Sequence, residues 1–386
     1  MKINLKILKI KNKIIIHQIT FSAIGGIQNS FIPFYKLSKS KSDFKHKIYG
    51  MHPIDPYFKE IKKYYVNFNK SIIAKIKFIY YIFSKKYIIH FYNTLSSNKI
   101  KYLLKFVPSN KIIFHERGTS WSAKKDDFKT IRSNAKKADI IIANSNASKI
   151  LLNKRFNIDN HKIKVIHNGF LSKKFKSFNI SRFSNKFSVG YIGRLDTPKG
   201  VHVLVEAAKK LADIDFFIAG DGILEKKLTL MSKGYDNIKF IGRAKPLDFI
   251  LKMDLMVFPS IREPLGNVII ESGFCKKAVI ASNIDGIPDI IDDGLNGLLL
   301  TPKNDLSLKD IPDNAVPIPD YVIDSKRKKL LKPKEIDKNE LIASINFLMK
   351  NKNARILMGE NLHKKVKNDF SLEKYYSEIE KIYKIF

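Results

Sequence analysis

The stretch LMVFPSIREPLGNVIIESG, residues 255–273, decides the fold of the second half of the chain. Its first six residues predict a buried strand, and Glu263 follows on a loop. A residue that precedes a proline is disfavoured in the α region, so Glu263 is not expected inside a helix. The helix is predicted to begin near Asn267. Glu271 then lies in its first two turns and faces the same crevice as Glu263.

These two carboxylates neutralise no cation that is visible in the sequence. Carboxylate oxygens accept hydrogen bonds from vicinal hydroxyl groups, which sugars and riboses supply. Glu271 could instead be an ordinary acid at a helix start, where the helix dipole favours it. The apolar residues around it, 268–270 and Phe274, disfavour that alternative. The pattern therefore indicates hydroxyl recognition.

Short apolar runs alternate with amphipathic segments along the whole chain, which is typical of parallel α/β layers. Strands are predicted at residues 13–20, 86–93, 111–116, 138–145, 163–169, 187–193, 215–220, 238–242, 255–260, 278–282 and 297–300. Helical segments such as 200–212, with apolar residues at three- and four-residue spacing, lie between them. The fold class is therefore α/β, with two doubly wound, Rossmann-like parallel sheets.

Two polar segments interrupt this pattern. Residues 177–187 have no period and predict a linker between an N-terminal domain, 1–180, and a C-terminal domain, 187–370. Residues 302–339 are rich in Pro, Asp and Lys and predict an irregular surface insertion. A small partner-binding insertion is the alternative.

Open parallel sheets bind ligands at the carboxyl ends of their strands, and GRLDTPKG, residues 193–200, follows such a strand. Arg194 and Lys199 lie on this loop between Gly193 and Gly200. Two cations beside a helix N-terminus make a good receptor for a diphosphate. Two solvated cations are the alternative, which the flanking glycines disfavour.

Glycines mark three further strand ends. Gly25 and Gly26 lead into the first helix, where close backbone approach and free N–H groups suit an anion. Gly220 and Gly222 end one later strand and Gly242 ends another, where a base or ribose could lie on the backbone. Each of these glycines could also be only part of a turn.

The net charge of +35 is concentrated in the first half of the chain. Residues 1–180 carry 37 Lys and Arg against 8 Asp and Glu, whereas residues 181–386 carry 34 against 28. An AT-rich genome explains an excess of Lys but not the scarcity of acids in one half only. A basic first half indicates an anionic partner such as a membrane surface, a phosphorylated lipid or nucleic acid.

Length and composition narrow the class of protein. The 386 residues fit two domains, and 44% apolar residues fit a globular chain. A single cysteine, Cys275, excludes an intrachain disulfide and a cysteine metal cluster. The apolar region 71–92 is interrupted by lysines well short of the ~20 apolar residues of a spanning helix, and no signal peptide is visible. We expect a cytoplasmic protein, with peripheral contact at the inner face of the cell membrane.

Taken together, the motifs resemble the retaining GT-B glycosyltransferases of family 4, the group 1 glycosyl transferases. The residues that carry the resemblance are GG at 25–26, FHERG at 114–118, ANS at 143–145, VIHNGF at 165–170, GRLDTPKG, AGDG, IKFIG, FPSIREPLGNVIIESG with its E-x7-E pattern, GIPDII and NG. The resemblance covers most of the chain and is strongest over 189–299. It implies a GT-B fold, with the final helix, 371–386, returning to the first domain.

The resemblance also implies a role for each site residue. Arg194 and Lys199 would hold the donor diphosphate, Glu263 the donor-sugar hydroxyls and Glu271 the ribose hydroxyls. His115, at a strand end in the first half, would lie beside the donor sugar. Backbone N–H groups near the phosphates and sugar would come from Leu265, Gly266 and Asn267. No divalent metal and no cofactor besides the nucleotide-sugar substrate is expected.

The resulting hypothesis is a metal-independent retaining hexosyltransferase that moves a sugar from a nucleotide diphosphate to a hydroxyl. The reaction would serve lipopolysaccharide or other cell-surface glycan assembly, with an anionic or lipid-linked acceptor at the basic first domain. An isomerase or phosphorylase of the same fold is the alternative. A nucleic-acid-binding protein is a more remote alternative, because that function would leave Glu263, Glu271 and the glycines unexplained. We therefore expect no nucleic-acid partner.

Overall fold

The computed structural model describes residues 13–22, 26–108, 111–171 and 181–386, and these divide into two compact units. The first unit comprises Met1–Leu171 and Ser371–Phe386, and the second comprises Ser172–Phe370. The predicted linker, 177–187, lies partly outside the described residues. The predicted terminal helix is present as α13, Leu372–Lys384, and belongs to the first unit.

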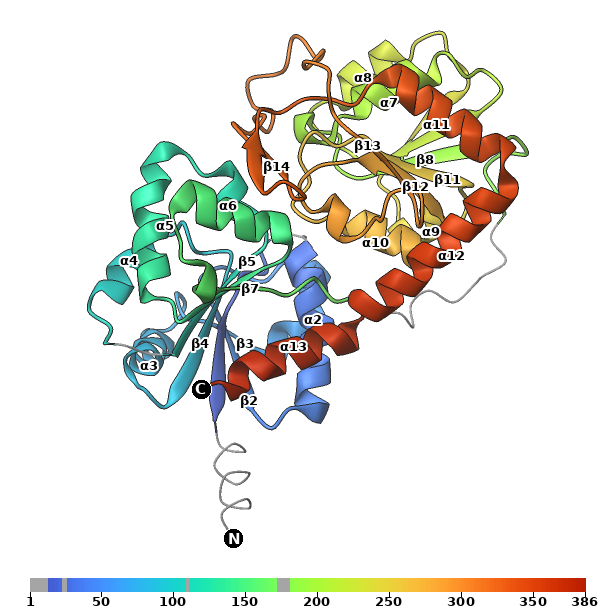
Figure 1. The fold of residues 1–386 in the computed structure, drawn as a ribbon. Coiled ribbons are helices and arrows are strands. Elements are labelled where there is room, and N and C mark those ends of the chain that lie inside the picture. Colours follow the sequence, from blue (N-terminus) through green and yellow to red (C-terminus); the bar gives the residue numbers. More distant parts are fainter. Residues whose placement is uncertain (1–12, 23–25, 109–110, 172–180) are drawn as a thin grey trace. The chain divides into compact units, whose positions relative to one another are not determined.

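The first unit is built on a parallel sheet of seven strands in the order β3-β2-β1-β4-β5-β6-β7 (Figure 1). Its strands are β1 Ile14–Gln18, β2 Lys45–Gly50, β3 Tyr65–Asn67, β4 Tyr87–Tyr92, β5 Lys111–Glu116, β6 Ile140–Ala143 and β7 Ile163–Val165. The helices between them are α2 Gly26–Lys41, α3 Ile72–Phe83, α4 Asn98–Lys105, α5 Lys125–Lys137 and α6 Asn146–Phe156, with 3-10 turns η1 Pro56–Tyr64, η2 Thr119–Ser122 and η3 Asn160–Lys162. The central strands are buried on both faces, which explains their unbroken apolar runs.

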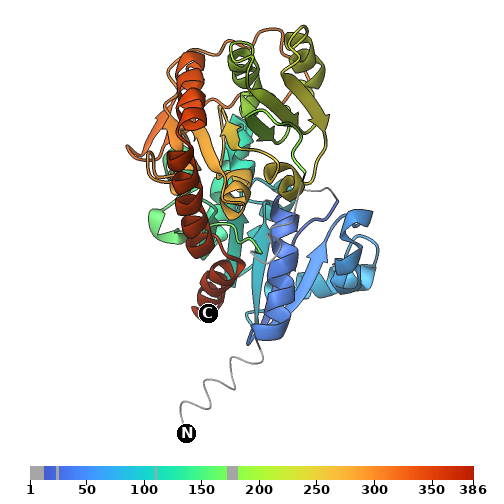
Figure 2. The same cartoon turned by 90° about the vertical axis from the view of Figure 1, so that its right-hand side faces the viewer.

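The helix α13 completes one face of this sheet. It packs against α2, and its residues Tyr375, Ile379 and Tyr383 join the apolar core of the sheet. Figure 2 shows α2, in blue, running along the strands that it covers. The last segment of the chain is therefore part of the core of the first unit.

The second unit is built on a parallel sheet of six strands in the order β10-β9-β8-β11-β12-β13. Its strands are β8 Ser188–Ile192, β9 Asp215–Ala219, β10 Ile238–Gly242, β11 Leu255–Phe258, β12 Ala278–Ser282 and β13 Leu298–Leu300. The helices are α7 Val201–Ala208, α8 Glu225–Met231, α9 Pro246–Ile250, α10 Asn267–Phe274, α11 Lys338–Lys350 and α12 Lys352–Asp369, with 3-10 turns η5 Thr197–Lys199 and η6 Ile287–Asp289.

The strand order of each sheet reverses beside the strand that comes first in the chain. In the second unit β8 pairs with both β9 and β11. The strands β9 and β10 therefore extend the sheet on one side of β8, and β11 to β13 extend it on the other. Such a reversal opens a crevice at the carboxyl ends of the two strands. The loops after β8 and β11 are those that carry residues 193–200 and Glu263.

All eleven predicted strands are present, and the described residues form four further strands that were not predicted. Two of these, β2 and β3, lie at the edge of the first sheet, where charged and exposed residues hide the apolar pattern. The other two, β14 Val322–Asp324 and β15 Lys329–Leu331, form an antiparallel hairpin inside 302–339. The expectation of an irregular segment there is thus wrong for this hairpin, in which Val322 and Ile323 are buried.

Candidate functional site

The loop after β8 has a conformation that depends on glycine. Gly200, between η5 and α7, has a φ of +63°, and a Cβ there would lie 2.0 Å from the carbonyl oxygen of Pro259. The carbonyl oxygen of Pro198 accepts hydrogen bonds from the N–H groups of Ile261 and Arg262, at 2.9 and 3.0 Å. The loops after β8 and β11 are therefore held directly against each other, as the strand order requires.

This arrangement brings Lys199 and Glu263 together. The Lys199 Nζ atom lies 2.5 Å from Glu263 Oε2, and the two side chains are only 20% and 17% exposed. The expectation that Glu263 neutralises no cation is therefore wrong, because its partner comes from a loop 64 residues earlier. Arg194, by contrast, is largely exposed and lies 3.6 Å from the carboxylate of Asp196.

Further polar groups surround this pair. The hydroxyl of Tyr191 donates to the carbonyl oxygen of Arg194 at 2.9 Å, and burial together with Glu263 raises its pKa. Burial lowers the pKa of the Arg262 guanidinium, while the charges of Asp285 and Glu263 oppose that shift. The site thus holds several interacting charges in a partly buried setting, where their mutual interactions are stronger than in water.

Asp285 fixes the loop that carries Glu263. It is fully buried, and one carboxylate oxygen accepts from the N–H of Glu263 at 2.8 Å. The other accepts from the N–H of Ile323 at 2.7 Å, and the Ser325 hydroxyl donates to the Asp285 carbonyl at 2.6 Å. Burial raises the pKa of Asp285, while these N–H donors and Arg262 oppose the rise. Asp285 was not among the site residues predicted from the sequence.

The insertion 302–339 also contacts the loop after β8. The carboxylate of Asp196 accepts from the N–H groups of Thr197, at 3.0 Å, and of Val316, at 3.1 Å. The hydroxyl of Thr197 donates to the carbonyl oxygen of Val316. The insertion therefore braces both loops of the site, one through Asp196 and the other through Asp285.

A buried hydrogen bond between His202 and Glu335 secures the base of the insertion. The His202 Nε2 atom lies 2.8 Å from Glu335 Oε2, and both side chains are buried. Burial would raise the pKa of Glu335, but hydrogen bonds from His202 and Ser307 outweigh it and lower the pKa. The insertion is thus attached to α7, the helix that follows Lys199.

Three predicted glycines end β9 and β10. Gly220 and Gly222 have φ values of +131° and +159°, and a Cβ at either would meet a carbonyl oxygen, of Gly193 at 1.8 Å and of Leu195 at 2.3 Å. These two glycines therefore allow the loop after β9 to pack against the loop after β8. Gly242 has a φ of +69° and has no other atom within 4 Å of a Cβ position among the described residues.

The remaining predicted donor-side residues surround the start of α10. Gly266, with a φ of +106°, is its N-cap residue, and no side chain caps this end of the helix within the described ranges. A Cβ at Gly266 would lie 3.0 Å from Cδ1 of Ile269, and the positive φ at this position also favours glycine. Leu265 is buried, Asn267 is the first residue of α10, and Glu271 is half-buried in the next turn.

The predicted site residues of the first unit are Gly25, Gly26 and His115, and they lie outside the loops of the second unit described above. Gly25 lies outside the described residues, and Gly26 is the first residue of α2. His115 is 1% exposed, and its ring lies against those of His90, Tyr92 and Tyr375. Neither of its ring nitrogens has a hydrogen-bond partner within the described part of the chain. Its predicted place beside a donor sugar stays a prediction.

His115 belongs to a cluster of four histidines on neighbouring strands, of which His17, His90 and His115 are buried and His46 is half-buried. His17 lies 2.8 Å from His46 and 3.1 Å from the hydroxyl of Tyr92, while His90 lies 2.7 Å from that of Tyr383. Burial lowers the pKa of all four rings, that of His46 to about 4. The hydrogen bond of His90 ties α13 to β4, so this cluster stabilises the return of the final helix.

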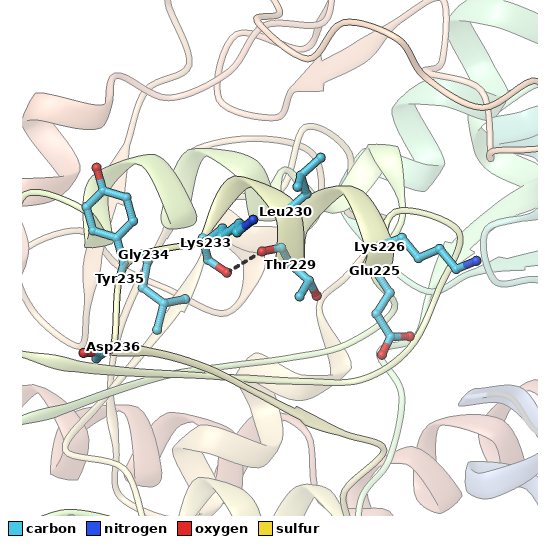
Figure 3. Close-up of a pocket in the computed structure, with 10 residues that line it drawn as sticks. Glu225, Lys226, Thr229, Leu230, Lys233, Gly234, Tyr235 and Asp236 are labelled. Atoms are coloured by element: carbon cyan, nitrogen blue, oxygen red, sulfur yellow. Dashed lines mark hydrogen bonds between the residues drawn. The ribbon is translucent and has the colours of Figure 1, made fainter.

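A surface hollow along α8 contains none of the predicted site residues. It is lined by both charged and apolar side chains: Glu225, Lys226, Thr229, Leu230, Ser232, Lys233, Gly234, Tyr235, Asp236 and Ile238. Figure 3 shows Glu225 and Lys226 at one end of the helix and Tyr235 and Asp236 at the other. Among the described residues, no group of three or more His, Cys, Asp or Glu side chains could hold a metal ion.

Two Rossmann-like units, the second of which carries this loop arrangement, define a GT-B fold. The chain is similar to HepE of Anabaena, solved with UDP-glucose, with a TM-score of 0.74 and 19% identity over 97% of this chain and 100% of that one. Residues 172–315 match the family model of the group 1 glycosyl transferases.

Curated relatives agree with the family match. An uncharacterized glycosyltransferase of Methanocaldococcus jannaschii is 36% identical over 126 residues, 31% of this chain and 35% of its own length. The capsular polysaccharide biosynthesis glycosyltransferase CapM of Staphylococcus aureus is 24% identical over 268 residues, 67% of this chain and 59% of its own. The chain therefore spans about a third to three fifths of the relatives that it matches.

Proposed function

We propose that this protein is a retaining glycosyltransferase that moves a sugar from a nucleotide diphosphate to a hydroxyl acceptor in cell-surface glycan assembly. The observation that carries the proposal is the meeting of Lys199 and Glu263 at the point where the strand order of the second sheet reverses. The family match of residues 172–315 and the relationship to CapM support it.

Each member of this pair has a role that suits its chemistry. The Lys199 ammonium and the exposed Arg194 guanidinium would bind the diphosphate and offset the charge that develops on it as the sugar leaves. The Glu263 carboxylate would accept hydrogen bonds from sugar hydroxyls. A diphosphate would compete with Glu263 for Lys199, and sugar hydroxyls would replace the bond that Glu263 loses.

Deeper donor contacts would come from α10. The N-terminus of this helix would place the backbone N–H groups of residues 265–267 near phosphate and sugar, where the helix dipole favours negative charge. Glu271, one turn further along, would accept from the ribose hydroxyls. In this scheme cations and helix dipoles stabilise the leaving group without a divalent metal.

Thermal unfolding with UDP, GDP and ADP and their sugars tests the proposal. We expect one nucleotide to stabilise the protein, with and without a chelator, and Arg194→Ala with Lys199→Ala to abolish the shift. The matched control is Lys226→Ala, an exposed lysine of the same unit. No shift with any nucleotide would contradict the donor site. A chelator-sensitive shift would contradict metal independence.

Product analysis then separates transfer from the alternatives. A transferase releases free nucleotide only when a hydroxyl acceptor is present, and the product keeps the anomeric configuration of the donor. An isomerase needs no acceptor, and a phosphorylase requires inorganic phosphate. Capsule- or lipopolysaccharide-type lipid-linked glycans are the first acceptors to test, because the first unit is strongly basic.

A further inference from the structure

The helix α3 of the first unit has two apolar faces. One face packs into the unit and consists of Ala74, Phe78, Tyr81 and Ile82. The other face is exposed to solvent, and we call it the α3 ridge: Ile72, Ile73, Ile76, Ile79, Tyr80 and Phe83. Ile72 and Ile76 keep 78% and 61% of their surface exposed. A helix that packs only against its own domain has no use for such a second face.

The ridge is continuous and is bordered by lysines. At about 100° per residue, its six side chains fall within an arc of about 120°. By the same geometry Lys75 lies just beyond one border of this arc and Lys77 just beyond the other. Both lysines are exposed. The surface is therefore an apolar strip with one lysine along each border.

The surrounding sequence carries only positive charge. Residues 61–115 contain eleven lysines and no Asp or Glu. Lys70 directly precedes α3 and its N-cap residue Ser71, and Lys85 and Lys86 directly follow the helix; all three lysines are exposed. A partner of this surface must therefore be both negatively charged and apolar.

We propose that the α3 ridge docks on an anionic membrane surface. The isoleucines and Phe83 would enter the boundary between headgroups and acyl chains, and Tyr80 would lie at headgroup level. The flanking lysines would contact lipid phosphates. This inference deepens the proposed function by placing the acceptor at a bilayer. Only the location of the acceptor rests on the proposed function; the docking surface itself does not.

The arrangement disfavours the other occupants of an apolar strip. A second copy packed through the same ridge by twofold symmetry would bring Lys75 and Lys77 of the two copies close to each other. Nucleic acid would meet the phosphate-binding lysines, but aliphatic isoleucines offer no face on which bases stack. Among the described residues no helix is long and apolar enough to cross a membrane, so the contact would be parallel to the surface.

Flotation of the full chain with vesicles tests this docking surface. We expect binding to mixed phosphatidylcholine–phosphatidylglycerol vesicles at low salt, and little binding to phosphatidylcholine alone. The triple variant Ile72→Ser, Ile73→Ser, Ile76→Ser should bind at least about tenfold more weakly, because it removes the inserted groups. Lys75→Gln with Lys77→Gln should also weaken binding by about tenfold and reduce its salt dependence.

Matched controls separate the ridge from general surface properties. Leu230→Ser, Leu295→Ser and Leu357→Ser change three leucines of the second unit with 71%, 59% and 58% exposure, and this variant should bind like the wild type. Wild-type protein that stays unbound at low salt would overturn the proposal. Equal binding of the isoleucine variant would also overturn it, because the net charge alone would then carry the contact.

The same variants distinguish this inference from the proposed function. The isoleucine variant should keep the thermal shift with the donor nucleotide, because α3 and the donor loops belong to different units. If the wild type binds vesicles but no nucleotide shifts its thermal unfolding, the proposed docking surface is supported and the proposed donor site is rejected. If a nucleotide shifts the thermal unfolding but the wild type does not bind vesicles, the proposed donor site is supported and the proposed docking surface is rejected.

Discussion

The carboxylate of Asp285 accepts hydrogen bonds from the backbone N–H groups of Glu263 and Ile323, at 2.8 and 2.7 Å. One buried side chain therefore joins the loop of the proposed sugar-binding glutamate to the hairpin of the insertion. Asp285 itself adopts a φ of +49°, which asparagine and aspartate tolerate better than most residues. The insertion is thus part of the framework that positions Glu263.

Substitution of Asp285 should destabilise the second unit in a graded way. Asp285→Ala leaves two buried N–H groups without acceptors, which costs about 2–5 kcal/mol of unfolding free energy. Asp285→Asn keeps one acceptor oxygen and should cost less. Urea unfolding followed by far-UV circular dichroism measures both, and nucleotide titration should show weaker sugar-nucleotide binding in each variant.

Asp310→Ala is the matched control for this series. Asp310 has a similar φ of +47°, but its side chain is exposed, so its replacement carries the same backbone strain without the buried bonds. An Asp285→Ala loss no larger than that of Asp310→Ala would show that the two hydrogen bonds do not hold the site loop.

The pair of Lys199 and Glu263 predicts different effects for its two members. Lys199→Met should weaken binding of the nucleotide diphosphate by about tenfold to a hundredfold, because it removes a charge-assisted hydrogen bond. Glu263→Gln should bind the free nucleotide at least as tightly as the wild type, because the carboxylate that competes for Lys199 is lost, and should strongly reduce turnover of the sugar nucleotide. Calorimetry with the nucleotide and steady-state kinetics with the sugar nucleotide distinguish the two effects.

A second ion pair of the same unit serves as a control. Lys209 and Glu206 also lie 2.5 Å apart and are partly buried, but they are one turn apart on a helix end away from the loop after β11. Lys209→Met should leave nucleotide binding unchanged. Equal losses from Lys199→Met and Lys209→Met would mean that neither lysine contacts the phosphates.

The sequence predicted the strands and the two loops of the site because both leave a local signal. Buried parallel strands such as β6 and β12 are continuous apolar runs, and Pro264 marks the loop before α10. The pairing of Lys199 with Glu263 depends on β8 lying beside β11, and strand order is not a local property. Asp285 was missed for the same reason, since its two partners come from different loops.

Gly220 and Gly242 provide a matched pair for the glycine hypothesis. A Cβ at Gly220 would lie 1.8 Å from the Gly193 carbonyl oxygen, so Gly220→Ala should displace the loop after β8 and weaken nucleotide binding about tenfold or more. Gly242→Ala meets no atom of the described residues and should cost only about 1 kcal/mol of backbone strain. Nucleotide titration of both variants checks this, and equal affinities would reject the packing role of Gly220.

His115→Phe tests the predicted catalytic role of His115 against a role in packing. The ring is 1% exposed, so phenylalanine keeps its volume and removes two buried nitrogens without partners among the described residues. Stability should therefore be unchanged or higher. If His115 acts beside the donor sugar, turnover falls by about tenfold or more while stability holds. Full turnover would remove His115 from the catalytic residues.

The cluster of four histidines, three of them buried, predicts that acid destabilises the first unit. Burial lowers the pKa of His17, His46, His90 and His115 in the folded protein, whereas an unfolded chain titrates near 6.5. Below about pH 6.5 the unfolded state therefore binds protons that the folded state does not. The free energy of unfolding should thus decrease as the pH is lowered.

Each neutral buried ring should contribute a slope of about 1.4 kcal/mol per pH unit, which for His46 ends near its folded pKa of about 4. The sole tryptophan, Trp121, is buried in the first unit, so its fluorescence during urea unfolding at pH 5 to 8 reports this unit alone. His46→Gln should reduce the slope of stability with pH by the contribution of one ring. A free energy of unfolding that stays constant from pH 7 to pH 5 would show that the folded cluster takes up protons like the unfolded chain.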